Sequence, residues 1–222
     1  CDWSSDVCSS DPETTIVPQL LAEIDGVEAL QNVIVIGASN REDMLDPAIL
    51  RPGRLDVKIR VDRPDAAGAQ EIFGIYLTRE LPIHPQEIAA HGTTEAAIDH
   101  MITESVEALY ARNADNAFVE VTYHDGSTEV LYFADFVSGA TIANIVDRAK
   151  RLAIKDYLDA LRTNHQAGKG LKTSHLLQAV REEKFQQLDL PDTAAPQQWL
   201  RLAGHRSGQA IALRVIQEGP AA

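Results

Sequence analysis

The sequence predicts an α/β region followed by a helix-rich region that contains a β-hairpin. The run NVIVIGASN is continuously apolar from Val33 to Ile36 and ends in small residues, which is typical of a parallel strand buried on both faces. From Leu55 to Val61, apolar and charged residues alternate, and this pattern predicts a half-buried strand. Further along, Asp125-Gly126 separates two alternating, aromatic-rich runs, which is a strong hairpin signal.

The first region is predicted to contain a helix, a strand, a short helix, a strand and a helix. Apolar residues at helical spacing predict the first helix over Thr14–Ile24. Asp46 fits the N-cap of a short helix over Pro47–Leu50, and Asp65 fits the N-cap of a helix that runs to about Leu81. Two strands cannot make a stable doubly wound sheet, so we expect this region to be part of a larger α/β unit.

The second region begins near Pro82. A helix is predicted from about Thr94 to Ala111, before the hairpin. Ser138 and Gly139 open a long helix with one apolar face, formed by Ile142, Ile145, Val146, Ala149, Leu152 and Ala153. A polar loop at 164–172 leads to a helix from Ser174 to about Leu188, and the chain closes with a strand at Ala210–Ile216.

The composition argues against nucleic acid and membrane partners. The chain has 33 acidic and 20 basic side chains, a net charge of −13, whereas binding to phosphate backbones or anionic membranes depends on clustered Lys and Arg. No apolar run approaches the roughly 20 residues that a membrane-spanning helix needs. There is also no secretory pattern, so we expect a cytoplasmic protein.

The first eleven residues, CDWSSDVCSSD, have no apolar periodicity and contain both cysteines, Cys1 and Cys8. This stretch resembles a translated sequencing adapter, and we expect residues 1–11 to be non-native; the alternative is a disordered native linker. No His pair lies at ligand spacing nearby, so the sequence predicts neither a metal site nor a disulfide framework.

The stretch VIVIGASNREDMLDPAILRPGRLD, residues 33–56, resembles the second region of homology of AAA-family ATPases. The resemblance implies that Asn40 is the sensor-1 residue, which orients the attacking water or touches the terminal phosphate. It also implies that Arg51 and Arg54 are arginine fingers that act on the nucleotide of a neighbouring subunit. Arginine suits this role because its guanidinium is planar, forked and permanently charged. The alternatives are an Asn that only forms a turn and arginines that are only solvated.

A second stretch, SGATIANIVDRA at 138–149, resembles the start of the AAA lid helix, in which a Gly-Ala pair packs near the nucleotide. Gly139 and Ala140 match that pair. The alternative is ordinary helix capping with close packing.

The hairpin inserted in the lid and long stretches on both sides of it resemble the proteasome-associated branch of the AAA family. The resemblance implies a hexameric ring of identical subunits that uses ATP and Mg²⁺ to unfold pupylated proteins and pass them into the proteasome core. It also implies a domain order: the C-terminal part of the AAA large subdomain at 12–81, the lid with its hairpin at 82–190, and a closing linker and strand at 191–222.

The sequence departs from this family pattern in two places. It contains no G-x-x-x-x-G-K-[ST] phosphate loop and no apolar run ending in Asp-Glu, and GKG at 168–170 lacks both the spacing and the preceding strand. We therefore expect a C-terminal fragment that is inactive alone, with most ATP and Mg²⁺ ligands in the missing part. The chain also ends in IQEGPAA rather than Gln-Tyr-Leu, which leaves proteasome docking open.

Two other functions remain as alternatives. The chain could be a non-catalytic assembly module that lends arginines to a partner's site, or part of a AAA ATPase that is not coupled to a proteasome. The absence of H-E-x-x-H argues against a zinc protease, and the absence of G-x-S-x-G argues against a serine hydrolase.

Overall fold

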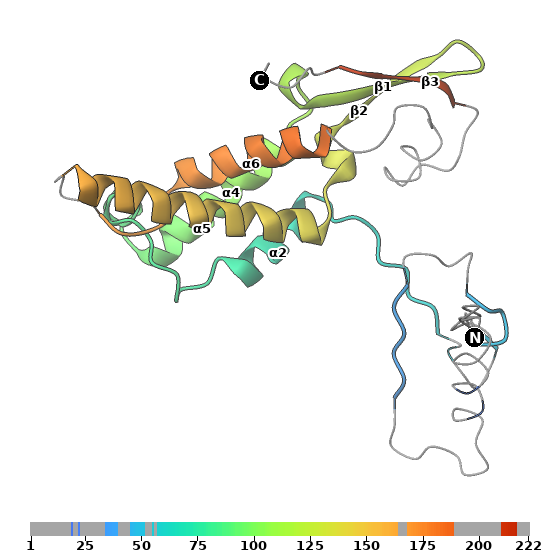
Figure 1. Ribbon diagram of the computed structural model, residues 1–222, viewed down its shortest axis with the longest axis horizontal. Coiled ribbons are helices and arrows are strands. Elements are labelled where there is room, and N and C mark those ends of the chain that lie inside the picture. The colour runs from blue at the N-terminus through green and yellow to red at the C-terminus, as the bar shows by residue number, and fades with distance from the viewer. Residues whose placement is uncertain are drawn as a thin grey trace, which may run out of the picture. The chain divides into compact units, whose positions relative to one another are not determined.

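A computed structural model (Figure 1) describes residues 34–39, 45–51, 57–163, 168–188 and 210–216, together with Gln19, Ala22 and Leu55. The chain divides into two compact units, Cys1–Val61 and Asp62–Ala222. This boundary lies earlier in the chain than the junction near Leu81 and Pro82 that the sequence predicts. The reason is that helix α2 (Ala66–Tyr76) packs on α4 (Thr94–Tyr110) and α5 (Gly139–Arg162) of the second unit.

In the first unit, Asp46 begins a turn, as predicted, but no helix follows. Its carboxylate accepts a hydrogen bond from the Ala48 amide at 2.8 Å, and its carbonyl accepts one from the Ile49 amide at 3.0 Å. The predicted helix over Pro47–Leu50 is therefore wrong, and the segment forms two overlapping turns, the second closed by the Leu50 amide on the Pro47 carbonyl at 3.2 Å. Pro52 disfavours helical backbone at Arg51, so a helix could not extend beyond Leu50.

Among the described residues of the first unit, neither predicted strand is formed. Ile34 and Ile36 are 87% and 88% exposed, and neither 34–39 nor 57–61 forms a strand. A strand buried on both faces needs a neighbour along its edges and helices over its faces, and the described residues of this unit supply neither. Of the helix predicted over Thr14–Ile24, the structure describes two residues, both helical, and the rest lies outside the described residues.

The second unit contains five α-helices among its described residues. They are α2, α3 (Pro85–His91), α4, α5 and α6 (Thr173–Leu188). Asp65 caps α2 as predicted, since its carboxylate accepts a hydrogen bond from the Gly68 amide at 2.8 Å. Helix α2 ends at Tyr76 rather than near Leu81, because Leu77 leaves the helical region with ψ of 73°. The predictions for α4, α5 and α6 are confirmed to within one residue at each start, whereas α3 was not predicted.

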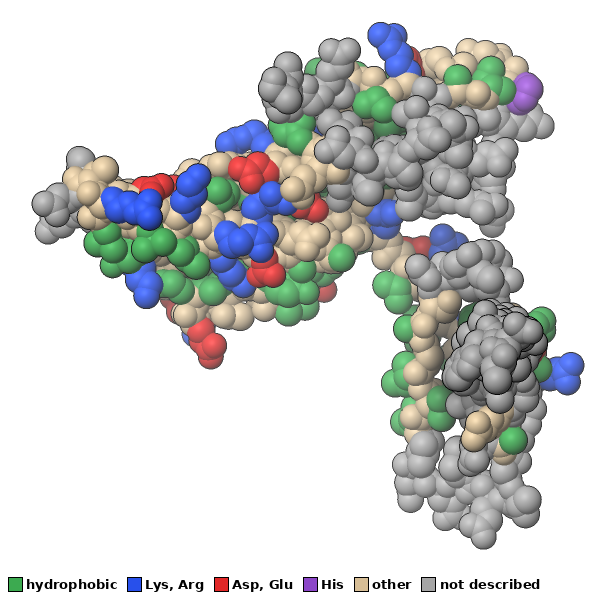
Figure 2. Space-filling model, in the orientation of Figure 1, with side chains coloured by type: hydrophobic (Ala, Val, Ile, Leu, Met, Phe, Trp, Pro, Cys, Tyr) green, Lys and Arg blue, Asp and Glu red, His purple; other side chains and the backbone are tan. Residues whose placement is uncertain are grey.

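The core of the second unit lies between its long helices. Helix α5 packs along α6 and also contacts α2, while α4 contacts α2, α3 and α6 (Figure 1). Ile142, Ile145, Val146 and Ala149 of the predicted apolar face are fully buried. On the outer surface, basic and acidic side chains are interspersed over these helices (Figure 2), which leaves no large surface of one sign in this view.

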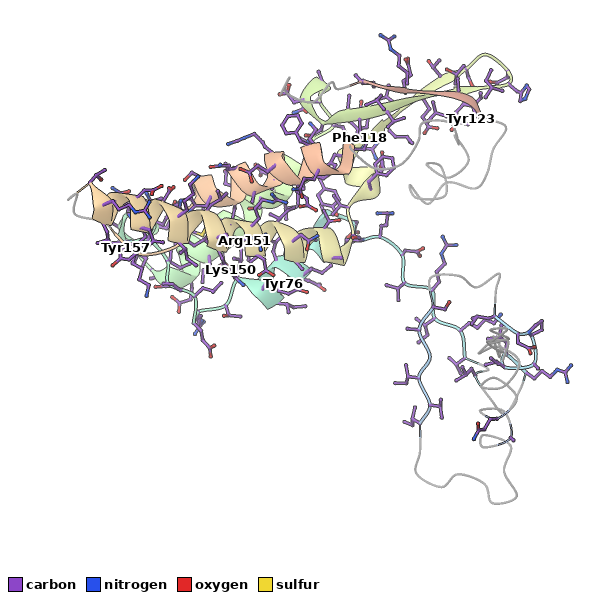
Figure 3. All side chains as sticks on the ribbon, viewed as in Figure 1. Tyr76, Phe118, Tyr123, Lys150, Arg151 and Tyr157 are labelled. Atoms are coloured by element: carbon purple, nitrogen blue, oxygen red, sulfur yellow. The ribbon has the colours of Figure 1, made fainter. Side chains whose placement is uncertain are left out.

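A three-stranded antiparallel sheet completes the second unit. The predicted hairpin is confirmed: β1 (Ala117–Tyr123) pairs with β2 (Thr128–Tyr132), and Gly126 turns the chain with φ of +82°. The closing strand β3 (Ala210–Val215) is also confirmed, and it pairs with the other edge of β1. Figure 3 places Phe118 where the sheet meets the helices, and its ring lies 5.2 Å from that of Phe136, centroid to centroid.

Candidate functional site

The structure describes three of the five residues predicted to form the site. Arg51 lies in the first unit, and Gly139 and Ala140 lie in the second. Asn40 and Arg54 lie outside the described residues. The two parts are therefore described separately.

The turn that carries Arg51 is closed by contacts within the first unit. The Leu55 amide donates to the carbonyl of Ile49 at 3.1 Å, so residues 49 and 55 are held together. Ile49 is buried and Arg51 is exposed, which points the turn's arginine outward. A Cβ on Gly37 would lie 3.2 Å from Leu55 Cδ1, so the turn packs closely on the segment that leads into Asn40.

The N-terminal end of α5 is capped by a reciprocal pair. The Ser138 hydroxyl accepts from the Thr141 amide and the Thr141 hydroxyl accepts from the Ser138 amide, both at 3.2 Å. No acidic residue lies in the first turn, so the partial positive charge of this helix end is not neutralised locally. A Cβ on Gly139 would meet Ile72 Cδ1 at 3.9 Å, an ordinary contact distance. The packing of this unit therefore does not require a glycine there.

The segment 63–65 is bound to the second unit next to this helix end. Arg63 donates to the carbonyls of Phe136 and Val137, the latter at 3.3 Å, and the Tyr110 hydroxyl donates to the carbonyl of Pro64 at 2.7 Å. Burial lowers the pKa of Arg63. Burial, and then the nearby Asp65 carboxylate, raises the pKa of Tyr110 to about 12, which keeps its hydroxyl a donor.

A cavity of about 320 Å³ lies against this segment. Arg112 and Asp135 line it and form an ion pair at 3.2 Å, in which the arginine is largely exposed and also lies over the Tyr132 ring. Sequence reasoning did not identify Arg63 or Tyr110. The signal available in the sequence was that Arg63 lies directly before a proline and the Asp65 helix cap.

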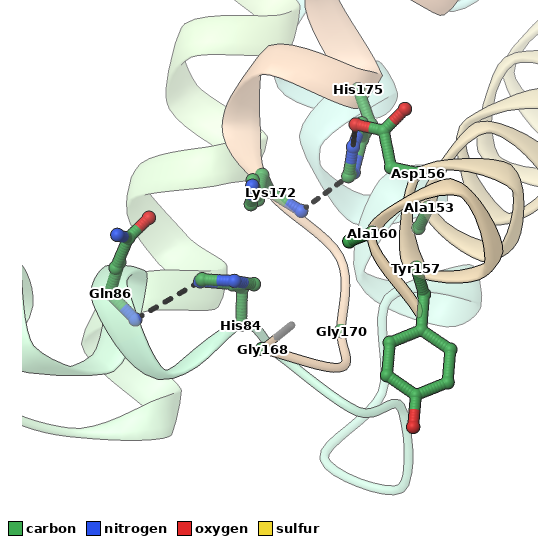
Figure 4. A pocket seen from close by; sticks show the side chains of 10 residues that line it. All are labelled: His84, Gln86, Ala153, Asp156, Tyr157, Ala160, Gly168, Gly170, Lys172 and His175. Carbon is green, nitrogen blue, oxygen red and sulfur yellow. Dashed lines mark hydrogen bonds and ion pairs between the residues drawn. The ribbon is translucent and has the colours of Figure 1, made fainter. Parts of the chain in front are cut away.

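A second cavity, of about 200 Å³, lies at the far end of α5 and contains two buried histidines (Figure 4). His175 Nδ1 accepts from the Lys172 amide at 3.2 Å and its Nε2 faces Asp156 Oδ2 at 2.9 Å, so the proton of the neutral ring belongs on Nε2. His84 Nδ1 accepts from the Gln86 amide at 3.2 Å and caps α3. Burial lowers the pKa of His84, and the Lys172 charge acts in the same direction.

The GKG sequence forms one wall of this second cavity. A Cβ on Gly168 would lie 2.3 Å from His84 Nε2, and one on Gly170 would lie 2.5 Å from the His84 amide nitrogen. Gly168 therefore leaves room for the ring of His84, and Gly170 allows close approach to the backbone of Ile83 and His84. Lys169 between them is exposed.

The described residues contain no cluster of three His, Cys, Asp or Glu side chains placed to hold a metal ion. Among the helices that the structure describes, none has both the length and the apolar character needed to cross a bilayer.

Comparison with known proteins identifies the family. Residues 64–222 match the family described as "ARC, AAA+ ATPase lid domain", and residues 5–63 match "ATPase family associated with various cellular activities (AAA)". A proteasome-associated ATPase of Thermobifida fusca is 56% identical over 212 residues, which cover 95% of this chain and 35% of that protein. Relatives of the same name from Streptomyces coelicolor and Acidothermus cellulolyticus are 56% and 55% identical, with the same coverage.

The chain thus spans about a third of the length of these relatives. The two matched families together account for the predicted fold class, an AAA α/β part followed by a lid that carries a hairpin. The lid match alone covers more than half of the chain. The chain belongs to the AAA ATPase family, with an AAA domain region followed by an ARC lid domain.

Proposed function

We propose that this chain is part of a hexameric AAA ATPase of the cytoplasm that unfolds tagged, typically pupylated, proteins and passes them into the proteasome core. The observation that carries the proposal is the 56% identity, over 95% of the chain, to a relative named proteasome-associated ATPase. The lid match at 64–222 supports it independently of the AAA region.

In this proposal Asn40 is the sensor-1 residue, and Arg51 and Arg54 stabilise the transferring phosphoryl group on a neighbouring subunit. Phosphoryl transfer depends mainly on positioning and on electrostatic stabilisation, which a forked guanidinium supplies. The closed turn between Ile49 and Leu55, with Arg51 exposed on it, supports an outward-facing arginine.

Gly139 and Ala140 are proposed to lie against the bound nucleotide. The fit is favourable because Gly139 has room around it and the first turn of α5 carries no carboxylate that would repel phosphates. ATP would supply the phosphoryl group whose transfer drives unfolding. For Mg²⁺, the described residues offer no acidic cluster, and we assign none of them to the ion.

The test is Arg54→Ala in the complete ATPase. We expect hydrolysis to fall at least about 10³-fold while nucleotide affinity stays within about threefold, because an arginine finger acts on the transition state. Arg181→Ala, which removes an exposed arginine on α6, is the charge-matched control and should retain activity. Steady-state phosphate release and nucleotide titration give the two values, and an equal loss of both would contradict the role.

Mixed rings test whether the finger acts between subunits. Arg54→Ala subunits retain their own nucleotide sites, so mixing them with subunits disabled in nucleotide binding should recover part of the hydrolysis. No recovery in rings shown to be mixed would rule out action in trans. With the proteasome core present, the wild-type ring should degrade a pupylated substrate, and hydrolysis without degradation would refute the proteasomal part of the proposal.

A further inference from the structure

We infer that Arg63 is a positioning residue that couples the N-terminal end of α5 to the segment joining the two units of the chain. Its consequence for ATP-driven work rests on the function proposed above. The hydrogen-bonded link itself does not rest on that function, because it follows from contacts within the second unit alone.

The first observation is where the guanidinium binds. Arg63 donates to the carbonyls of Phe136 and Val137, the two residues that directly precede the Ser138 cap of α5. Both residues are buried, so these carbonyls lie on a stretch of backbone fixed by its own side chains. A planar fork can engage two neighbouring carbonyls together, which the point charge of a lysine does less well.

The second observation is that the residues after Arg63 are bound as well. The Tyr110 hydroxyl donates to the carbonyl of Pro64 at 2.7 Å, and the Asp65 carboxylate caps α2 through the Gly68 amide at 2.8 Å. Each residue of 63–65 is therefore hydrogen-bonded within the second unit. By contrast, Val61 is 91% exposed, and the division between the units falls directly after it.

Together these contacts bind the chain from Arg63 to Asp65 within the second unit. A ligand that shifts the backbone around Ser138 and Gly139 also shifts the carbonyls that Arg63 holds, and through them the start of the connecting segment. Arg63 thus links the helix end proposed to contact nucleotide with the chain that leads to the first unit. Tyr110 supports the same link from α4.

Hydrogen exchange tests the structural part in the 222-residue chain without nucleotide. Arg63→Met keeps most of the side-chain volume and removes both bonds, so the amides of 65–69 should exchange roughly tenfold faster, a factor typical of losing a charge-assisted hydrogen bond. The matched control is Arg112→Met. Arg112 lines the same cavity but binds Asp135. Its exchange at 65–69 should equal that of the wild type, and unchanged exchange in Arg63→Met would overturn the inference.

The complete ATPase tests the consequence. In Arg63→Met we expect nucleotide affinity and hydrolysis within about threefold of wild type, but roughly tenfold less substrate unfolded per ATP hydrolysed. Arg63→Lys should recover part of this ratio, and Tyr110→Phe should lower it less than Arg63→Met does. An unchanged ratio, or hydrolysis and unfolding lost in proportion, would overturn the coupling role.

These results also separate the two proposals. If the wild-type protein hydrolyses no ATP while exchange at 65–69 still responds to Arg63→Met, the proposed function fails and the structural link stands. If Arg63→Met does not fold, Tyr110→Phe decides the question, because it removes only one hydroxyl. It should speed exchange at the same amides, and no change there would overturn the link.

Discussion

Gly170 shows how one residue can be required by the backbone around it. Its φ of +140° lies in a region that other residues rarely adopt, and its Cα faces the backbone of Ile83 and His84. There the His84 amide donates to the carbonyl of Leu171 at 2.9 Å, and Ile83 and Leu171 form a parallel bridge. A side chain at Gly170 would have to push these two segments apart.

Gly170→Ala should therefore destabilise the chain by about 3 kcal/mol, through backbone strain and overpacking together. Gly74→Ala is the matched control, since Gly74 lies in α2 with nothing within 4 Å of the added Cβ. It should stabilise the chain by about 0.5–1 kcal/mol because alanine favours the helix. Urea unfolding measures both, and a loss at Gly170 no larger than about 1 kcal/mol would contradict the packing argument.

At the scale of elements, the contact between α5 and α6 contains a partly buried charge cluster. Arg148 of α5 donates to Glu183 at 3.2 Å and to Glu182 at 3.4 Å, and it also bonds Gln186. The side chains of Arg148 and Glu183 are only 18% and 7% exposed. Arg148 Nε is buried without a hydrogen-bond partner among the described residues. The desolvation free energy of this donor is therefore not offset by a hydrogen bond.

Arg148→Met should destabilise the chain by about 3 kcal/mol, because it leaves the Glu183 carboxylate buried and unpaired. Adding Glu183→Leu should restore most of the stability, since an apolar pair of similar volume removes the unpaired charge. Arg162→Met, at the exposed end of α5, removes an ion pair whose arginine is 80% exposed and should cost less than about 0.5 kcal/mol. Thermal unfolding of the four proteins is the measurement, and a double variant no more stable than Arg148→Met would refute the argument.

At the scale of the whole molecule, the two units differ in what they bury. The second unit encloses a continuous apolar core that joins its long helices to the sheet through Phe118 and Phe133. The described residues of the first unit instead expose Ile34, Ile36 and Val57. Apolar side chains at this level of exposure are suited to burial against further strands and helices.

A protein made of these 222 residues alone should not hydrolyse ATP. Its sequence has no phosphate loop and no apolar run ending in Asp-Glu, so the groups that bind the phosphates and the metal would be absent. Phosphate release at millimolar Mg-ATP should equal that of a buffer blank, while the complete ATPase assayed beside it turns over. Hydrolysis that persists through purification and co-elutes with the 222-residue chain would contradict this prediction.

The local features of the fold could be predicted from the sequence because their hydrogen bonds join residues only a few positions apart. Asp65 and Ser138 cap their helices, and Asp125-Gly126 turns the hairpin, through contacts with residues two to three positions away or through backbone torsion. The candidate nucleotide contact at Gly139 could be recognised only through family resemblance, because a glycine at a helix start is common in itself.

The sequence by itself determined the starts of α2, α4, α5 and α6, the hairpin and the family resemblance, since short-range patterns and motifs carry these directly. Only the tertiary structure decided that β3 pairs with β1, that Arg63 binds the carbonyls before α5, and that the GKG glycines pack on His84. It also decided against strands at 34–39 and 57–61, whose apolar patterns fit a sheet that the described residues do not form. The physical reason is the same in each case: pairing and burial depend on partners far away in the chain, and no local pattern specifies them.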